Sequence, residues 1–404
     1  MKSILLASAS ILAFAGAAAA EVTFGGSATL GYNDTDSERP DGENGETVGS
    51  GAGFFWDANI AVTASTMLDN DLTAAVSFDF DVADGNLGQT LEAGGFLLSL
   101  TSESAGLYFG DTAFAAETYW SPAGDMATDN FSEADGETVL RGEVVYGSVT
   151  AGLSYIIDVD TSFDANLIDG SEDTTDKAGT GDLVQLSLGA TATFGNFTVG
   201  AAYQEAIDPI YLATQITDGR AVNLPGPPPR TVFINTTTAE VYNDNGDISN
   251  DEVFGAFGST SFAGFDVSLA YSTNLTAETN SIGVAASYPL GPVTLGAAYV
   301  MESDTDDFWE VSADYASGPV TVSAYYDSTE DYGIDATYVV GNNITALAGF
   351  TDAGEDYYVG AEVGLGSDAV LGVYYADDGD LDNDDDIGGP ELRDGATVEI
   401  GFSF

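Results

Sequence analysis

A two-strand pattern that recurs along the chain constrains its fold more than any other feature. The pattern is clearest in residues 186–207, which read LSLGATATFGNFTVGAAYQEAI. Apolar residues alternate with small or polar ones from Leu186 and again from Phe197, and Gly195-Asn196 separates the two runs. Side chains on a strand point to opposite faces with period two, so each run has one apolar face. A Gly-Asn pair between two such runs favours a tight hairpin.

Most of the chain consists of similar runs of roughly 9–11 residues, the length that crosses a bilayer at a tilt. Short and longer connections alternate between the runs, as in an up-and-down antiparallel barrel with turns at one end and loops at the other. We find no convincing helical period and, after the N-terminal segment, no apolar stretch long enough for a transmembrane helix. A count of every run gives about 20 strands, and an even number places both chain ends on one side of a barrel.

The first twenty residues have the pattern of an export signal. Lys2 precedes the apolar run 4–15, and Ala18-Ala19-Ala20 forms a cleavage site of the A-x-A kind. We therefore expect residues 1–20 to be a cleaved signal peptide and residues 21–404 to form a single barrel domain. The alternative, a short membrane anchor, is disfavoured because the apolar run is too short to span a bilayer.

The charge balance excludes several partners and chemistries. The chain has 66 acidic and 7 basic residues, which give a formal net charge of -59. Nucleic acid and anionic head groups are therefore poor partners, whereas cations are good ones. The absence of His excludes His-based triads and most zinc sites, and a large hydrogen-bonded sheet without Cys needs no disulfides. Solubility in a salty habitat is the alternative explanation of the acidic excess.

Carboxylates on the strands indicate which kind of barrel this is. In a packed core such groups would be buried largely without partners, at a cost on the order of several kcal/mol each. A water-filled lumen with a lipid-facing exterior explains the alternation best, although a two-sheet sandwich with a solvated exterior stays open. The predicted lumen wall consists of the acids that lie opposite the branched and aromatic residues: Asp57, Asp79, Asp81, Glu310, Asp314, Asp335, Glu362 and Glu399.

Two connections are too long to be simple turns. Residues 112–136 combine aromatic and acidic side chains, as expected of a loop that packs on something and carries function. Residues 208–251 contain the stretch PGPPP at 225–229, which cannot pair as a central strand. We expect 208–251 to be a long surface loop outside the barrel or folded over its rim.

The acidic loop 377–394 begins like a calcium-binding loop, with Asp378, Asp380 and Asp382 at alternate positions. Asn383 and Gly389 stand where an EF-hand has Gly and Glu, so the match to that motif is poor. Binding of a hard cation by clustered loop acids stays open, and no particular metal ligands are predicted.

The final strand indicates that the barrel lies in an outer membrane. Val398, Ile400, Phe402 and Phe404 lie on one face of it. This ending looks like the C-terminal signature of bacterial outer-membrane barrels, which would make the outer-membrane assembly machinery a partner of this strand. The alternative is a chance apolar end to a soluble strand.

Three segments resemble one family. EVTFGGSATLGY from residue 21, ATFGNFTVGAAYQEAID from residue 192 and the final VEIGFSF look like the trimeric general-diffusion porins of Rhodobacter-type alphaproteobacteria. The resemblance implies a 16-stranded barrel, so the predicted fold is an all-β transmembrane barrel with 16–20 strands, 20 being the best count. It also implies a homotrimer in outer-membrane lipid, and calcium bound by acidic loops.

In that family the third loop folds into the lumen, where its acids face basic residues on the wall. Phe109-Gly110-Asp111 is similar to the family's approach to this loop, so residues 112–136 are the expected constriction loop. On the strand that follows, Arg141 and Glu143 share the polar face, and Arg141 is the candidate for the opposing cation. The candidate acids are Asp111, Glu117, Asp125, Asp129, Glu133, Asp135 and Glu137. For each single acid the alternative is a solvated loop charge.

The predicted function is that of a porin in the outer membrane of a Gram-negative bacterium. Such a barrel is a water-filled, cation-preferring channel for passive diffusion of ions and small hydrophilic solutes. No enzymatic activity is expected, and no cofactor other than the calcium just mentioned. The alternatives are an outer-membrane enzyme with a carboxylate-only site, a plugged structural or adhesive barrel, and a substrate-selective channel.

Overall fold

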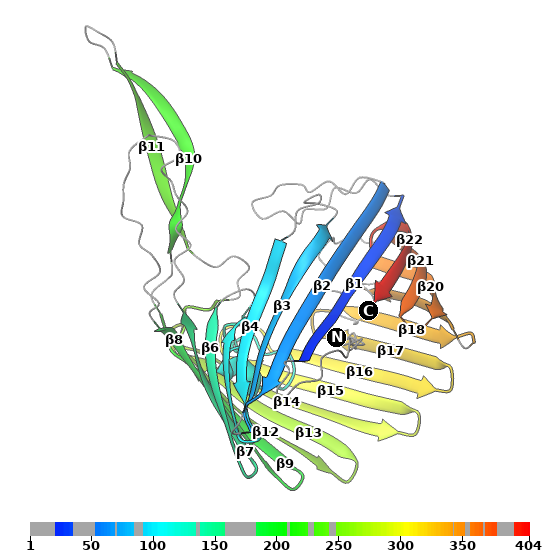
Figure 1. The fold of residues 1–404 in the computed structure, drawn as a ribbon. Coiled ribbons are helices and arrows are strands. Elements are labelled where there is room, and N and C mark those ends of the chain that lie inside the picture. Colours follow the sequence, from blue (N-terminus) through cyan, green and yellow to red (C-terminus); the bar gives the residue numbers. More distant parts are fainter. Residues whose placement is uncertain are drawn as a thin grey trace.

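The chain forms one antiparallel sheet of 20 strands that closes on itself (Figure 1). The computed structural model describes residues 21–34, 53–68, 71–84, 92–134, 138–157, 183–207, 211–224, 230–241, 248–341, 343–351, 356–366, 368–377 and 392–404. The first strand pairs with the second on one side and with the last on the other, which closes the cylinder. The predicted all-β barrel and the count of 20 strands are thereby confirmed. The expected signal peptide, residues 1–20, lies outside the described residues and stays a prediction.

The strands of the first half are β1 (Glu21–Asn33), β2 (Gly53–Met67), β3 (Thr73–Asp84), β4 (Glu92–Thr101), β5 (Ala105–Gly110), β6 (Val139–Tyr146), β7 (Val149–Ile157), β8 (Leu183–Phe194) and β9 (Phe197–Gln204). Those of the second half are β12 (Val253–Phe262), β13 (Phe265–Asn274), β14 (Thr279–Leu290), β15 (Val293–Glu302), β16 (Phe308–Ser317), β17 (Val320–Asp327), β18 (Tyr332–Val339), β19 (Ile344–Thr351), β20 (Asp356–Gly366), β21 (Ala369–Asp377) and β22 (Gly395–Ser403). A short helix, α1 (Ala115–Tyr119), lies between β5 and β6. Within the described ranges, no helix has the length and apolar character needed to cross a membrane.

The alternation along each strand gives the sheet two different faces. On β13, Leu269 and Tyr271 are 54% and 39% exposed, whereas their neighbours Ala270 and Ser272 are 1% and 0% exposed. The apolar side chains therefore cover the outside of the cylinder, and the small and polar ones face its interior. We call the interior face the wall. A continuous apolar outer surface of this kind is typical of proteins whose outer surface contacts lipid or another protein.

The seam of the cylinder is made by the two ends of the chain. The backbone N–H of Gly26 donates to the Phe404 carbonyl oxygen at 2.8 Å, and the Phe404 N–H donates to Gly26 at 3.0 Å. A Cβ at Gly26 would lie 2.4 Å from the Asn59 carbonyl oxygen and 2.9 Å from the Phe404 ring. The absence of a side chain at this position therefore allows the last residue to complete the ladder.

Strand register joins residues far apart in sequence into rows that run around the wall. One row consists of direct register partners, in the order Glu143, Gly152, Gly189, Ala202, Gly255, Ser272, Ser281 and Glu302. We call this the small-residue row, because only small side chains lie between its two glutamates. The next row toward the long-loop end, called the anchoring row, consists of Arg141, Ser154, Ser187, Gln204 and Val253.

The long connection 208–251 contains a hairpin that the sequence analysis did not predict. β10 (Tyr211–Leu224) and β11 (Arg230–Val241) form a two-stranded sheet separate from the barrel. Figure 1 shows this hairpin extending away from the cylinder, beyond the ends of the strands. The proline-rich stretch 225–229, which argued against a strand, lies between β10 and β11 and outside the described residues. Proline excludes central strand positions but is compatible with the connection of a hairpin.

Candidate functional site

The connection between β5 and β6 packs on the wall along residues 111–134, which we call the β5–β6 loop. Its helix α1 contacts β7, β8 and β9. Phe114, Ala115 and Ala116 are fully buried, and Ala123 and Met126 are nearly so. The apolar clusters that these residues form with β6–β9 and β12–β15 are the main core of the molecule among the described residues.

The small-residue row leaves room for the loop backbone. A Cβ at Gly189 would lie 2.5 Å from the Ala115 carbonyl oxygen, and one at Gly255 would lie 2.4 Å from the Trp120 ring. Gly283, on the neighbouring row, is tighter still, because its Cβ would lie 2.0 Å from the Ala123 carbonyl oxygen. Glycine permits a close approach of the loop backbone at positions 189 and 283, and of the Trp120 ring at position 255, which a Cβ would block.

Wall side chains satisfy the backbone of the loop. The N–H groups of Ala115 and Ala116 donate to the hydroxyl oxygens of Ser154 and Ser187 at 2.9 and 2.8 Å. Farther along the loop, the N–H of Ser132 donates to Gln204 Oε1 at 2.6 Å. These acceptors are members of the anchoring row and are at most 1% exposed. Buried backbone donors that lack a partner cost about 1–3 kcal/mol each, so this row stabilises one position of the loop.

The two glutamates that end the small-residue row also bind the loop. The Tyr119 hydroxyl donates to Glu143 Oε2 at 2.8 Å, and the N–H of Ala127 donates to Glu302 Oε1 at 3.0 Å. Ser281 donates its hydroxyl to Glu302 as well, and accepts the N–H of Thr128 at 3.1 Å. Burial, followed by the hydrogen bond to Glu143, raises the pKa of the Tyr119 phenol. The loop is thus attached at both ends of the small-residue row, through acceptors on β6 and β15, which lie far apart around the barrel.

Arg141, the predicted opposing cation, lies against the start of the loop. Its Nη1 donates to the Ala113 carbonyl oxygen at 3.1 Å and to Thr118 Oγ1 at 2.6 Å. Its guanidinium carbon lies 4.8 Å from the centre of the Tyr108 ring. Arg141 therefore positions the loop through its hydrogen bonds. Its role as a charge that opposes the loop acids stays a prediction.

The predicted loop acids divide into two groups. Glu117 Oε2 accepts the N–H of Phe114 at 3.0 Å, and Asp129 Oδ2 accepts the Trp120 indole N–H at 3.2 Å. Burial raises the pKa of the Glu117 carboxyl, which the Phe114 N–H partly offsets, and burial likewise raises the pKa of the Asp129 carboxyl. The second group, Asp111, Asp125 and Glu133, is exposed. Asp135 and Glu137 lie outside the described residues.

Most of the predicted wall acids lie on strands that the loop leaves uncovered. Asn59 Nδ2 donates to both Asp79 and Asp81 at 3.2 Å, and Ser323 Oγ donates to Asp314 Oδ1 at 2.8 Å. Glu310 lies on β16 with Asp314, and the remaining acids lie on four other strands: Asp57 on β2, Asp335 on β18, Glu362 on β20 and Glu399 on β22. Tyr358 donates its hydroxyl to Asp335, and Tyr374 donates to Glu362 at 3.4 Å.

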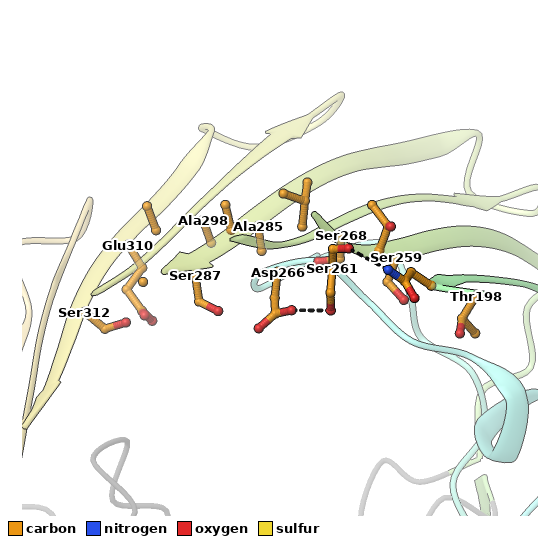
Figure 2. A pocket seen from close by; sticks show the side chains of 16 residues that line it. Thr198, Ser259, Ser261, Asp266, Ser268, Ala285, Ser287, Ala298, Glu310 and Ser312 are labelled. Carbon is orange, nitrogen blue, oxygen red and sulfur yellow. Dashed lines mark hydrogen bonds between the residues drawn. The ribbon is translucent and has the colours of Figure 1, made fainter. Parts of the chain in front are cut away.

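Beside the loop, the wall carries a hydroxyl-rich groove of about 480 Å³. Figure 2 shows its side chains on the concave side of the sheet, with α1 on the same side. Its labelled polar residues are Thr198, Ser259, Ser261, Asp266, Ser268, Ser287, Glu310 and Ser312. Ser261 donates its hydroxyl to Asp266, so part of this polar surface is already hydrogen-bonded within the wall.

Some residues of this site were missed by the sequence analysis. Glu302 on β15 and Gln204 on β9 occupy the positions that alternate with outward-facing side chains. This pattern predicts that they face the lumen, but not that they bind the loop. Arg393 was assigned only to an acidic loop, whereas its guanidinium carbon lies 3.9 Å from the centre of the Phe55 ring on the wall. A loop residue has no alternating apolar and polar neighbours, so the sequence gives no sign that Arg393 enters the barrel.

Metal binding was left open by the sequence. Among the residues with described positions, no group of three or more carboxylates is arranged to hold a metal ion. Residues 378–391, which include the loop with calcium-like spacing, lie outside that set. Calcium binding by the acidic loops therefore stays a prediction.

Substitution of Gly283 tests how the loop is held. In Gly283→Val the new side chain would overlap the Ala123 backbone, so we expect the loop to leave this part of the wall, with a loss of about 1–3 kcal/mol. Amide hydrogen exchange of residues 123–128 should accelerate. Gly142→Val is the matched control, because nothing lies within 4 Å of a Cβ at Gly142. Unchanged exchange in Gly283→Val would show that the loop does not rest on the wall at Gly283.

One protein family matches most of the chain. The family model described as "Gram-negative porin" matches residues 7–224 and 231–352, well over half of the chain. A comparison with curated proteins found no match. Among solved structures, a mutant of the Rh. blastica porin is 13% identical with a TM-score of 0.43, covering 96% of this chain and 100% of that one. A triple mutant of the Rhodopseudomonas blastica porin is 12% identical with a TM-score of 0.41 and the same coverage.

At these low values the structural similarities add nothing to the family model, and the barrel itself is established by the pairing of the strands. The family model covers the β5–β6 loop and most of the wall that holds it. The chain therefore belongs to the Gram-negative porin family, and its 20-stranded barrel is an outer-membrane channel.

Proposed function

We propose that this channel passes ions and small hydrophilic solutes by passive diffusion and prefers cations. The observation that carries the proposal is the distribution of charge on the wall. The strands left uncovered by the β5–β6 loop carry Asp79, Asp81, Glu310, Asp314 and Asp335. Among the residues whose side chains are described, the basic ones are Arg141 and Arg393.

A carboxylate-rich lumen raises the local concentration of cations and repels anions. The low dielectric of the surrounding protein and lipid strengthens this field, whereas dissolved salt screens it. Arg141 keeps its charge while it donates to the carbonyl oxygen of Ala113 and the Thr118 hydroxyl, but it is a single cation on the loop side of the barrel against several acids on the uncovered wall. Because diffusion through a wet hole needs no bond-making step, we propose no catalytic role for any of these groups.

We also propose that residues 112–136 form the constriction. The loop is attached through both ends of the small-residue row, so it takes up a fixed part of the lumen. Its exposed acids, Asp111, Asp125 and Glu133, would then border the remaining opening together with the uncovered wall acids. Two predicted constriction acids, Asp135 and Glu137, are included in this proposal by sequence alone.

Reversal potentials in planar bilayers under a KCl gradient test the cation preference. We expect K⁺ to be more permeable than Cl⁻, and the ratio to fall as salt rises, because the Debye length shrinks from about 10 Å at 0.1 M to about 3 Å at 1 M. Glu310→Gln and Asp314→Asn should each lower the ratio without changing the fold, since both positions face water. A preference for Cl⁻ in the unmodified protein would contradict the proposal.

We propose further that the channel is a homotrimer whose final strand, ending in Phe404, is read by the outer-membrane assembly machinery. Membership of the porin family and the exposed apolar outer face support this. Native mass measurement of protein extracted in mild detergent should give three chains per particle. A monomer that persists at all detergent concentrations would contradict the trimer and leave the channel function untouched.

A further inference from the structure

A second chain segment enters the barrel on the side away from the β5–β6 loop. Residues 392–394 directly precede β22. Leu392 packs against the cluster formed by Leu347, Tyr358, Tyr374 and Ala376. Tyr358 and Tyr374 belong to the wall, because they alternate with outward side chains and contact the wall acids Asp335 and Glu362. The 392–394 segment therefore lies inside the cylinder.

Hydrogen bonds fix this segment at its C-terminal end. Asn33 Nδ2 donates to the Asp394 carbonyl oxygen and to Thr397 Oγ1, both at 2.8 Å. The Ala396 N–H donates to Asp34 Oδ1 at 2.7 Å. Asn33 is only 7% exposed, so its two bonds form in a place that excludes water and hold the segment to the end of β1.

Arg393 is placed on the wall by this attachment. Its guanidinium carbon lies 3.9 Å from the centre of the Phe55 ring, a cation–π distance. The Phe55 ring in turn covers Gly31, where a Cβ would lie 2.0 Å from the ring. Gly31 is the register partner of both Phe55 and Glu399. Arg393 is therefore held on the same part of the wall as Glu399, where the two opposite charges attract each other.

A second carboxylate belongs to the same row. Glu399 and Glu362 are both register partners of Gly372, and the Tyr374 hydroxyl donates to Glu362. Glu399 thus has an aromatic ring on either side, Phe55 over Gly31 and Tyr374 over Gly372. Both rings exclude water from the flanks of this carboxylate, which strengthens its interaction with Arg393.

The circular order of the strands places the two interior elements opposite each other. From Tyr119 to Ala127 the β5–β6 loop crosses the wall between β6 and β15, and the 392–394 segment contacts it between β19 and β2. Three strands separate them on one side, β3, β4 and β5, and three on the other, β16, β17 and β18. The predicted wall acids on β3, β16 and β18 lie in these two gaps.

We propose that Arg393 is a specificity-determining residue of the channel, which lowers cation preference by neutralising the Glu399–Glu362 side of the opening across from the β5–β6 loop. This rests on the proposed function, since it assigns a role within the same ion path. Arg141 differs from Arg393 in that it lies on the loop side of the opening and hydrogen-bonds the loop itself. One cation therefore positions the loop, and the other sets the charge of the facing wall.

The test compares K⁺/Cl⁻ permeability ratios of variants of the full chain in planar bilayers near 0.1 M KCl. Arg393→Gln should raise the ratio by at least about twofold, because the part of the wall that carries Glu399 and Glu362 then loses its positive charge. Arg393→Lys should stay close to the unmodified protein, since it keeps the charge. Glu399→Gln should lower the ratio, and Arg393→Gln combined with Glu399→Gln should return it close to the unmodified value, so the two changes are coupled.

Glu310→Gln is the matched control, because Glu310 lies on β16, in the gap between the two elements. Its effect should simply add to that of Arg393→Gln. Opening of a channel by each variant shows that it has folded. If Arg393→Gln leaves the ratio unchanged while Glu310→Gln lowers it, the role of Arg393 is overturned and the proposed function survives. If the unmodified protein prefers Cl⁻, the proposed function fails, whereas the change between variants still decides the role of Arg393.

Discussion

Closure of a twisted antiparallel sheet is the constraint on which the rest of this structure depends. Each backbone N–H and C=O of a central strand finds its partner on a neighbour, which is what a bilayer demands of any segment that crosses it. Closure also turns the period of two into an inside and an outside, so Leu269 meets lipid while Ser268 meets the lumen. A slip of one residue in any pairing would exchange the two faces of a strand. The hydrophobic alternation therefore specifies the register as well as the fold.

The interior is organised by side-chain size. Where the β5–β6 loop lies on the wall, the small-residue row beneath it is made of Gly, Ala and Ser. The loop backbone approaches until a Cβ at Gly189, or at Gly283 on the neighbouring row, would overlap it. Where no loop lies on the wall, the same alternation supplies carboxylates and hydroxyls that water can reach. One sheet thus provides both a support for a buried segment and a polar surface for solutes. Small residues line the part of the sheet that supports the loop, and charged residues line the part that solutes reach.

Much of the fold can be predicted from the alternation of apolar and polar residues along each strand. The strands, their number, and the inward position of acids such as Asp79 and Glu310 can be predicted from alternation, because parity along a strand is a local property. The partners of the loop cannot be predicted in the same way. Ser187 meets Ala116 across a separation of 71 residues, which depends on register summed over several strands. Arg393 belongs to no strand, and the β10–β11 hairpin was concealed by its proline-rich connection.

The most direct measurement asks which face of a strand meets water in a lipid membrane. The chain has no Cys, so a single introduced cysteine is the only thiol in the protein. We expect Ser268→Cys to react rapidly with a charged, membrane-impermeant thiol reagent and Leu269→Cys to be protected in the same vesicles, because neighbouring residues on β13 face opposite sides. Rapid reaction at Leu269→Cys together with protection at Ser268→Cys would contradict the assignment of the polar face to a water-filled lumen.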